Sequence, residues 1–227
     1  MIEGFQLADF ERLTSGRRSV RAFLPDMVVR ETVKHVLRVT LATPSNCNAQ
    51  PWFIHVVSGD ALQRWSKALL DAASAGNEPD YDIAMAGPFP GKYRERQIDA
   101  AVRLFAAQNV ARGDAKARQA SLFRNYLFFD APHVALFCVP DWAGPREIAD
   151  CGQAMQTFML AATAAGLGTC PQGSLGGYAS TSRRILDLPD DQLVLAGVSF
   201  GYADDSDATA EVRPPRCELD ELVTFHS

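Results

Sequence analysis

Long hydrophobic runs are missing from this chain of 227 residues. No uninterrupted apolar stretch approaches the roughly 18 residues that a bilayer-spanning helix needs. The first thirteen residues, MIEGFQLADFERL, are acidic and amphipathic and lack the charged-then-apolar order of a signal peptide. We therefore expect a cytoplasmic protein that does not act at a membrane.

An excess of positive charge is also missing. The chain carries 22 basic and 27 acidic residues, which gives a net charge of −5. A protein that binds the phosphate backbone of DNA or RNA needs the opposite sign, or a strongly segregated basic face. The composition therefore argues against a nucleic-acid partner.

Paired cysteines are absent as well. The five cysteines are odd in number and widely scattered, and none belongs to a C-x-x-C pair. This pattern suggests neither a disulfide framework nor a structural zinc site. None of the four histidines has metal-ligand spacing or lies in a nucleophile motif. We expect buried, reduced thiols, histidines that are packed or solvated, and no metal site.

Apolar residues, by contrast, are plentiful. With 47% hydrophobic and 22% charged residues, the chain can bury a sizeable core, so it is neither disordered nor of low complexity. The length is large for one domain and small for two, and no linker or internal repeat divides the chain. We expect a single domain over residues 1–227.

Apolar periodicity predicts a helix-rich α+β fold with few strands. A crowd of Gly, Pro and Asp predicts a long loop over residues 76–92. The expected strands are 52–57, 133–140 and 192–203. The expected helices are 29–41, 59–75, 93–112, 115–128, 147–168 and 180–186.

Three arginines and a serine lie close together in RRSVR, residues 17–21. Arginine forks match phosphate oxygens, and serine adds a hydroxyl donor. Alternation along an extended backbone would place Arg17, Ser19 and Arg21 on one side. A second basic pair lies in RPPR, residues 213–216, and could converge on the same phosphate. A solvated charge run is the alternative.

An amide-rich segment, PSNCNAQPW, follows at residues 44–52. Asn and Gln side chains both donate and accept hydrogen bonds, so they suit a heterocycle edge or a polyol. The alternative is a helix stop with ordinary turn chemistry, which Pro and Asn also explain.

Taken together, these motifs resemble the FMN-dependent nitroreductases. The resemblance runs in order through RRSVR, P-S-x-x-N-x-Q-P-W, G-L-G-T at 166–169, P-Q-G at 171–173, G-x-x-x-G-Y at 197–202 and R-x-x-R near the C-terminus. It implies a nitroreductase-like fold, in which helices surround a central, mainly antiparallel sheet and two subunits interlock in a homodimer. Residues 76–130 carry no such landmark.

The resemblance also implies positions for the cofactor, FMN. The 17–21 cluster would hold the phosphate and ribityl chain with one of the tail arginines, and the amide loop would reach the flavin from the partner subunit. The main-chain N–H of Gly173 would point at flavin N5, where a side chain would obstruct the approach. The implied cofactor-binding residues are Arg17, Arg18, Ser19, Arg21, Pro44, Ser45, Asn46, Asn48, Pro171, Gln172, Gly173, Arg213 and Arg216.

The activity that the resemblance implies is reduction of nitroaromatic or quinone-like compounds with NADH or NADPH, by a ping-pong hydride transfer that needs no acid or base side chain. We expect Phe89, Tyr93, Phe123 and Tyr126 to line the acceptor pocket, with ordinary core packing as the alternative. Two other functions stay open at this point. The same fold could reduce an activated alkene or a carbon–halogen bond, or the chain could bind flavin without catalysis.

Overall fold

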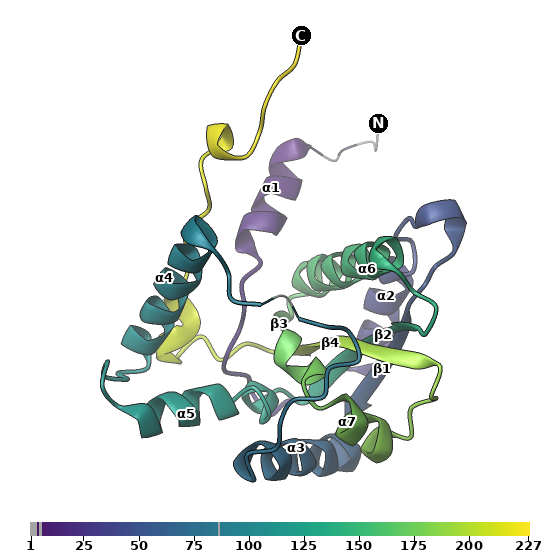
Figure 1. The fold of residues 1–227 in the computed structure, drawn as a ribbon. Helices are drawn as coiled ribbons and strands as arrows, with labels where there is room; N and C mark the ends of the chain where they lie inside the picture. Colours follow the sequence, from purple (N-terminus) through teal and green to yellow (C-terminus); the bar gives the residue numbers. More distant parts are fainter. Residues whose placement is uncertain (1–3, 5, 86) are drawn as a thin grey trace.

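The computed structural model describes residue 4, residues 6–85 and residues 87–227. These residues form an α+β fold in which helices surround one four-stranded sheet (Figure 1). The strands are β1 (Phe53–Ser58), β2 (His133–Pro140), β3 (Gly168–Gln172) and β4 (Gln192–Gly201). The helices are α1 (Leu7–Gly16), α2 (Arg30–Thr40), α3 (Gly59–Ser74), α4 (Gly91–Ala107), α5 (Ala115–Phe123), α6 (Pro145–Ala164) and α7 (Ala179–Leu186).

The sheet has the order β1-β2-β4-β3, and every neighbouring pair is antiparallel. The two central strands, β2 and β4, are the long apolar runs that the sequence predicts as strands. The mainly antiparallel sheet implied by the resemblance is therefore confirmed. β3 lies at one edge, where Ser19 pairs with Thr169 in a parallel bridge.

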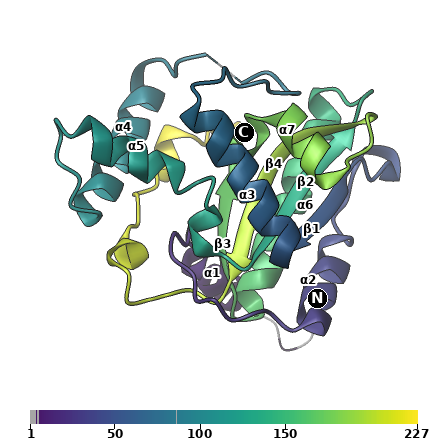
Figure 2. The same ribbon diagram turned by 90° about the horizontal axis from the view of Figure 1, so that it is seen from below.

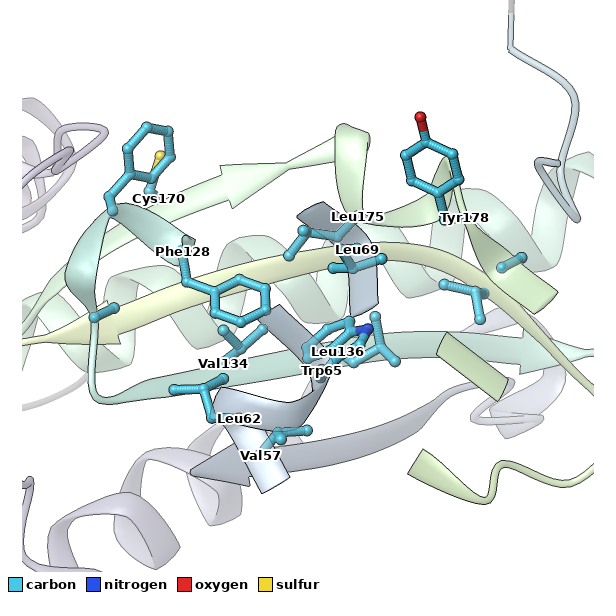
Figure 3. Close-up of a cluster of buried hydrophobic side chains, with 14 of the residues drawn as sticks. Val57, Leu62, Trp65, Leu69, Phe128, Val134, Leu136, Cys170, Leu175 and Tyr178 are labelled. Atoms are coloured by element: carbon cyan, nitrogen blue, oxygen red, sulfur yellow. The ribbon is translucent and has the colours of Figure 1, made fainter. Parts of the chain in front are cut away.

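Side-chain alternation along β2 divides the core into two layers. Val134, Leu136 and Cys138 are fully buried on the face that α3 covers. Trp65 and Leu69 of α3 are also fully buried there, and Figure 3 shows these side chains packed between helix and sheet. Full burial of an aliphatic side chain such as Leu69 contributes roughly 1.5–3 kcal/mol.

The other face of the sheet is covered by α2 and α6. Ala135, Phe137 and Val139 of β2 point to this side and pack in one cluster with Phe158 of α6 and Val36 of α2. Figure 1 shows α6 lying along the sheet with α2 beside it. Because both faces are covered, β2 is almost entirely apolar, as expected for a strand buried on two sides.

The C-terminus of α6 differs from the prediction. The sequence predicts helix through Gly168, but α6 ends at Ala164 and residues 168–172 form β3. Gly166 adopts a φ of 77°, which glycine tolerates without the cost of a Cβ. The Leu167 N–H then donates to the Ala162 carbonyl at 2.9 Å, closing a Schellman motif. The strand β3 therefore begins within the stretch whose apolar pattern predicts a continuing helix.

The helix expected over 115–128 is also shorter than predicted, because α5 ends at Phe123. Phe128, Phe129 and Asp130 have φ values of 55°, 56° and 67°. Left-handed conformations are costly for non-glycine residues and persist only where the surroundings hold them. Here both phenylalanines are buried, so apolar packing holds this turn.

Helices α4 and α5 project to one side of the sheet in both views (Figures 1 and 2). The C-terminal segment runs along α4, and Arg96 forms an ion pair with Glu221 at 2.8 Å. None of the described helices is both long and apolar enough to cross a membrane.

The cysteines follow the expectation only in part. Cys138, Cys151 and Cys170 are buried free thiols, as predicted. The prediction is wrong for Cys47, which is exposed, and for Cys217, which is half-buried. Both cysteines lie in segments outside the sheet and the helices that cover it.

Candidate functional site: an arginine-lined hollow at the sheet edge

The RRSVR segment leaves α1 and runs along the open edge of β3. The Arg17 N–H donates to the Leu13 carbonyl at 3.1 Å and ends the helix. Two residues after Arg18, the Val20 N–H donates to the Thr169 carbonyl at 2.9 Å. These bonds fix the backbone of residues 17–21, so the arginines emerge from an anchored segment.

Both basic clusters meet in one hollow of about 440 Å³. The sequence separates them by almost the whole chain, and the fold brings them together beside α1. Among the residues that the structure describes, Glu11 is the only carboxylate that lines the hollow. The residues lining the hollow are Glu11, Thr14, Ser15, Arg17, Arg18, Ser19, Arg21, Val212, Arg213, Pro214 and Arg216.

Electrostatics in the hollow favour an anion. Burial lowers the pKa of Arg17, and repulsion by the Arg216 guanidinium lowers it further. Burial and the neighbouring like charge both disfavour the charged form of a guanidinium. A bound phosphate would relieve that repulsion and accept charge-assisted hydrogen bonds from both groups.

Arg18 differs from its neighbours, because its guanidinium forms an ion pair with the Asp205 carboxylate. The Arg18 side chain is 12% exposed, although it also lines the hollow. Arg21 donates instead to the carbonyl oxygen of Ser19 at 3.3 Å. Within the described part of the chain, Arg18 is therefore the one side chain of the 17–21 cluster that is paired with a protein carboxylate.

The P-Q-G segment ends β3 with alternating exposure: Pro171 and Gly173 are exposed, and Gln172 is buried. A Cβ added to Gly173 would meet no protein atom within 4 Å, so the subunit leaves open space in front of it. The Gln172 side chain points inward, where its Nε2 donates to the Asn125 carbonyl at 2.8 Å. Because its side chain is buried, Gln172 leaves only its main chain for contact with a ligand at this edge.

The amide loop lies away from the arginine-lined hollow within a single subunit. Figure 1 shows it beyond the far end of α6 from α1, and none of residues 44–50 lines the hollow. Pro44, Asn46 and Asn48 are exposed. The structure therefore separates two segments that the resemblance assigns to one cofactor.

The expected pocket aromatics divide into two groups. Phe123 and Tyr126 pack together with ring centroids 6.2 Å apart, and Tyr126 also contacts Tyr178 edge-on at 5.6 Å. Burial, followed by the neighbouring phenols, raises the pKa of Tyr126 to about 12. Phe89 and Tyr93 are 47% and 53% exposed, and Tyr93 lies beside the Lys92 and Arg96 side chains.

Comparison with known proteins identifies the family. The profile described as "Nitroreductase family" matches residues 14–202. The chain belongs to the nitroreductase family. The chain is 42% identical over 216 residues to "Nitroreductase NfnB" of Mycolicibacterium smegmatis, covering 95% of this chain and 92% of that protein. It is 37% identical over 219 residues to the "Chloronitrobenzene nitroreductase" of Comamonas testosteroni, covering 94% and 95%.

A solved nitroreductase structure matches the fold in detail. The crystal structure of the FMN-dependent nitroreductase NfnB from Mycobacterium smegmatis, in complex with NADPH, superposes with a TM-score of 0.93. The two chains are 41% identical, and the match covers 98% of this chain and 100% of the other. The expected nitroreductase fold is thereby confirmed.

Sequence motifs did not reveal every residue that shapes this candidate site. Asn125 receives the Gln172 bond, Asp205 neutralises Arg18, and Asp150 bonds to the amide loop. Each is an ordinary polar residue in an unremarkable stretch, and its partner lies 47 to 187 residues away in the chain. No local sequence signal identifies such pairs.

Proposed function

We propose that this chain is an FMN-dependent oxidoreductase that uses NADH or NADPH to reduce nitroaromatic or quinone-like compounds. The observation that carries the proposal is the convergence of Arg17 and Arg216 in one hollow, where burial and the neighbouring Arg216 guanidinium lower the pKa of Arg17. Relatives called chloronitrobenzene nitroreductase and 4-nitrobenzoate reductase support the substrate class.

The residues of the hollow fit the phosphate end of FMN. Arg17, Ser19 and Arg21 supply charged and hydroxyl donors from the anchored segment. Arg213 or Arg216 completes the set from the tail. Arg18 remains in the proposed set, with a smaller share because Asp205 neutralises it.

The ring of the cofactor would lie along the exposed edge formed by Pro171 and Gly173. The open space in front of Gly173 supports this placement, because a flat ring needs an approach without a side chain. FMN held there would supply the redox chemistry, which is hydride transfer between the nicotinamide cofactor and the acceptor. The chain's own task is to bind, orient and exclude water, so no acid or base side chain is assigned.

The complete site would form only in a homodimer. Pro44, Ser45, Asn46 and Asn48 would reach the flavin of the partner subunit, which explains why they lie away from the hollow of their own subunit. Residues 1–227 would act as one FMN-binding domain within that dimer.

The acceptor would bind near Phe123 and Tyr126, which lie beside the turn that Gln172 holds. Phe89 and Tyr93 would contribute from the projecting α4 and the loop before it, where their exposure leaves them available to the partner subunit. We propose that all four side chains determine which acceptor the protein prefers.

The direct test is the visible spectrum of the purified protein together with the identity of any flavin released on denaturation. We expect a yellow protein that releases one FMN per subunit and oxidises NADH or NADPH when a nitroaromatic is added. Failure to bind FMN would refute the proposal. Bound FMN with no turnover would indicate a flavin-binding module, and turnover only with alkenes or organohalides would change the acceptor class.

A further inference from the structure

Asp150 is a buried carboxylate in the second turn of α6, with 7% of its surface exposed. Its Oδ2 accepts a hydrogen bond from the Asn46 N–H at 3.0 Å, and its Oδ1 accepts one from the Gln153 side chain at 3.3 Å. Across the described residues, no ion pair reaches Asp150. Burying a carboxylate without a cation is costly. A carboxylate that is buried with only two N–H donors therefore calls for a functional explanation.

The amide loop that Asp150 contacts has a strained backbone. Cys47, Asn48 and Gln50 adopt φ values of 50°, 57° and 49°, in the left-handed region. Such conformations persist only where neighbouring groups over-determine them, and they gather at ligand-binding segments.

The loop holds part of this shape by itself. The Gln50 N–H donates to Ser45 Oγ at 2.8 Å, and the Asn48 N–H donates to the Ser45 carbonyl at 3.1 Å. Within the described chain, every hydrogen bond made by residues 45–50 stays inside 45–52, except the one to Asp150. Asp150 is therefore the single hydrogen-bonded anchor between the loop and the core helix α6.

We propose that Asp150 is a positioning residue for the flavin of the partner subunit. Its carboxylate fixes the Asn46 main chain, and through it the direction in which the exposed Asn46 and Asn48 amides point. This inference rests on the proposed function, in which the loop of one subunit completes the cofactor site of the other. Preorganising the loop in the free protein removes an ordering cost from cofactor binding.

Substitution at Asp150 tests the role through FMN affinity, measured by quenching of flavin fluorescence on binding. Asp150→Ala removes the acceptor, and we expect the FMN dissociation constant to rise at least tenfold. Asp150→Asn keeps an oxygen that can accept from the Asn46 N–H, so the constant should stay within threefold of the unaltered protein. Equal FMN affinity in Asp150→Ala and the unaltered protein would overturn the proposal.

A matched control separates positioning from loss of stability. Ser182 is fully buried in α7, where its Oγ accepts from the Trp65 indole N–H at 3.0 Å. Ser182→Ala should unfold at lower urea concentration and yet bind FMN normally. If Ser182→Ala weakened FMN binding as much as Asp150→Ala did, the effect would be one of general stability and the positioning role would be wrong.

A mixed dimer tests whether Asp150 acts across the interface. One subunit carries Asp150→Ala and the other Arg17→Ala, with different tags for purification. If the loop serves the partner's flavin, the Asp150→Ala subunit keeps its own Arg17 and receives an intact loop. One site per dimer should then bind FMN with normal affinity. A mixed dimer without any site of normal affinity would overturn action across the interface.

The outcomes distinguish this inference from the proposed function. An unaltered protein that binds no FMN refutes the function, whereas an unaltered protein that binds FMN as tightly as Asp150→Ala refutes only the positioning role. If Asp150→Ala does not fold, Asp150→Glu supplies the same comparison, because the added methylene displaces the carboxylate from the position in which it accepts from the Asn46 N–H. Unchanged FMN affinity in a folded Asp150→Glu dimer would contradict the role.

Discussion

Gln172 and Asn125 join two segments of the site through a buried hydrogen bond, from the Gln172 Nε2 to the Asn125 carbonyl oxygen at 2.8 Å. Gln172 is 3% exposed, and the Ser199 hydroxyl donates to its Oε1. Asn125 lies between Phe123 and Tyr126, so the bond ties the end of β3 to the aromatic pair. The position of these rings depends on a side chain that itself faces away from the proposed flavin.

Gln172→Ala should therefore change acceptor use more than flavin binding. The substitution removes one of two donors to the Asn125 carbonyl, which keeps the Phe128 N–H at 3.1 Å, and it leaves the buried Ser199 hydroxyl without its acceptor. We expect the free energy of unfolding to fall by roughly 1–3 kcal/mol. The KM for a nitroaromatic should rise, with little change in FMN affinity. Ser199→Ala is the control, since it removes the other bond of the same amide and leaves Asn125 paired. Equal acceptor KM values in both variants would contradict this role.

Arg17 and Arg18 should contribute unequally to FMN binding. Arg17→Ala removes a partly buried guanidinium that repels Arg216, and loss of a charge-assisted bond to phosphate should cost roughly 1.5–3 kcal/mol of binding free energy. Arg18→Ala should cost less, because Asp205 already neutralises Arg18. FMN titrations of the two variants at one salt concentration make the comparison. A larger loss for Arg18→Ala would reverse the assignment.

His133 should make folding stability depend on pH. The Val28 N–H donates to its Nε2 at 3.1 Å, the ring stacks on Phe200, and burial lowers the pKa of the imidazole. The unfolded chain takes up a proton below about pH 6.5, which the folded ring resists. The stabilising contribution is therefore complete above pH 6.5 and is lost as the pH falls below it.

Urea unfolding at pH 7.5 and pH 5.5 measures this loss. Other groups titrate over the same range, so the comparison is with His133→Gln, which can still accept from Val28 but does not titrate. We expect the fall in unfolding free energy between the two pH values to be smaller in His133→Gln. An equal decrease in unfolding free energy in both proteins would show that His133 does not cause the pH dependence.

Steady-state kinetics should give parallel double-reciprocal lines. The donor and the acceptor would use one pocket in turn beside Phe123 and Tyr126, so no ternary complex forms. Tyr126→Phe should shift the preference between nitroaromatic and quinone-like acceptors while leaving FMN content unchanged. Intersecting lines would indicate that both substrates bind together, in separate places.

Much of the fold was predictable because it depends on local apolar patterning. The strand over 133–140 is marked by an unbroken apolar run between prolines, and the long helix before β3 by its small residues. The end of that helix was not predictable from periodicity, because the small-residue pattern continues past Ala164. A single glycine conformation at Gly166 decided where the strand begins.

The site was predictable only where its residues form motifs. The RRSVR cluster and the tail arginines line one hollow, and their charge had suggested that they could converge. The pairs Gln172–Asn125, Arg18–Asp205 and Asp150–Asn46 depend on contacts between distant segments. The strained turn at 128–130 arises likewise from the burial of Phe128 and Phe129, which a local helical pattern does not reveal.

If the hollow of Arg17 and Arg216 binds the phosphate of FMN, tight flavin binding depends on that phosphate. Parallel titrations of the flavin-free protein with FMN and with riboflavin, which lacks the phosphate, test it most directly. We predict that FMN binds at least tenfold more tightly than riboflavin at low salt, and that Arg17→Ala reduces this ratio. Equal affinity for the two flavins, or an unchanged ratio in Arg17→Ala, would contradict it.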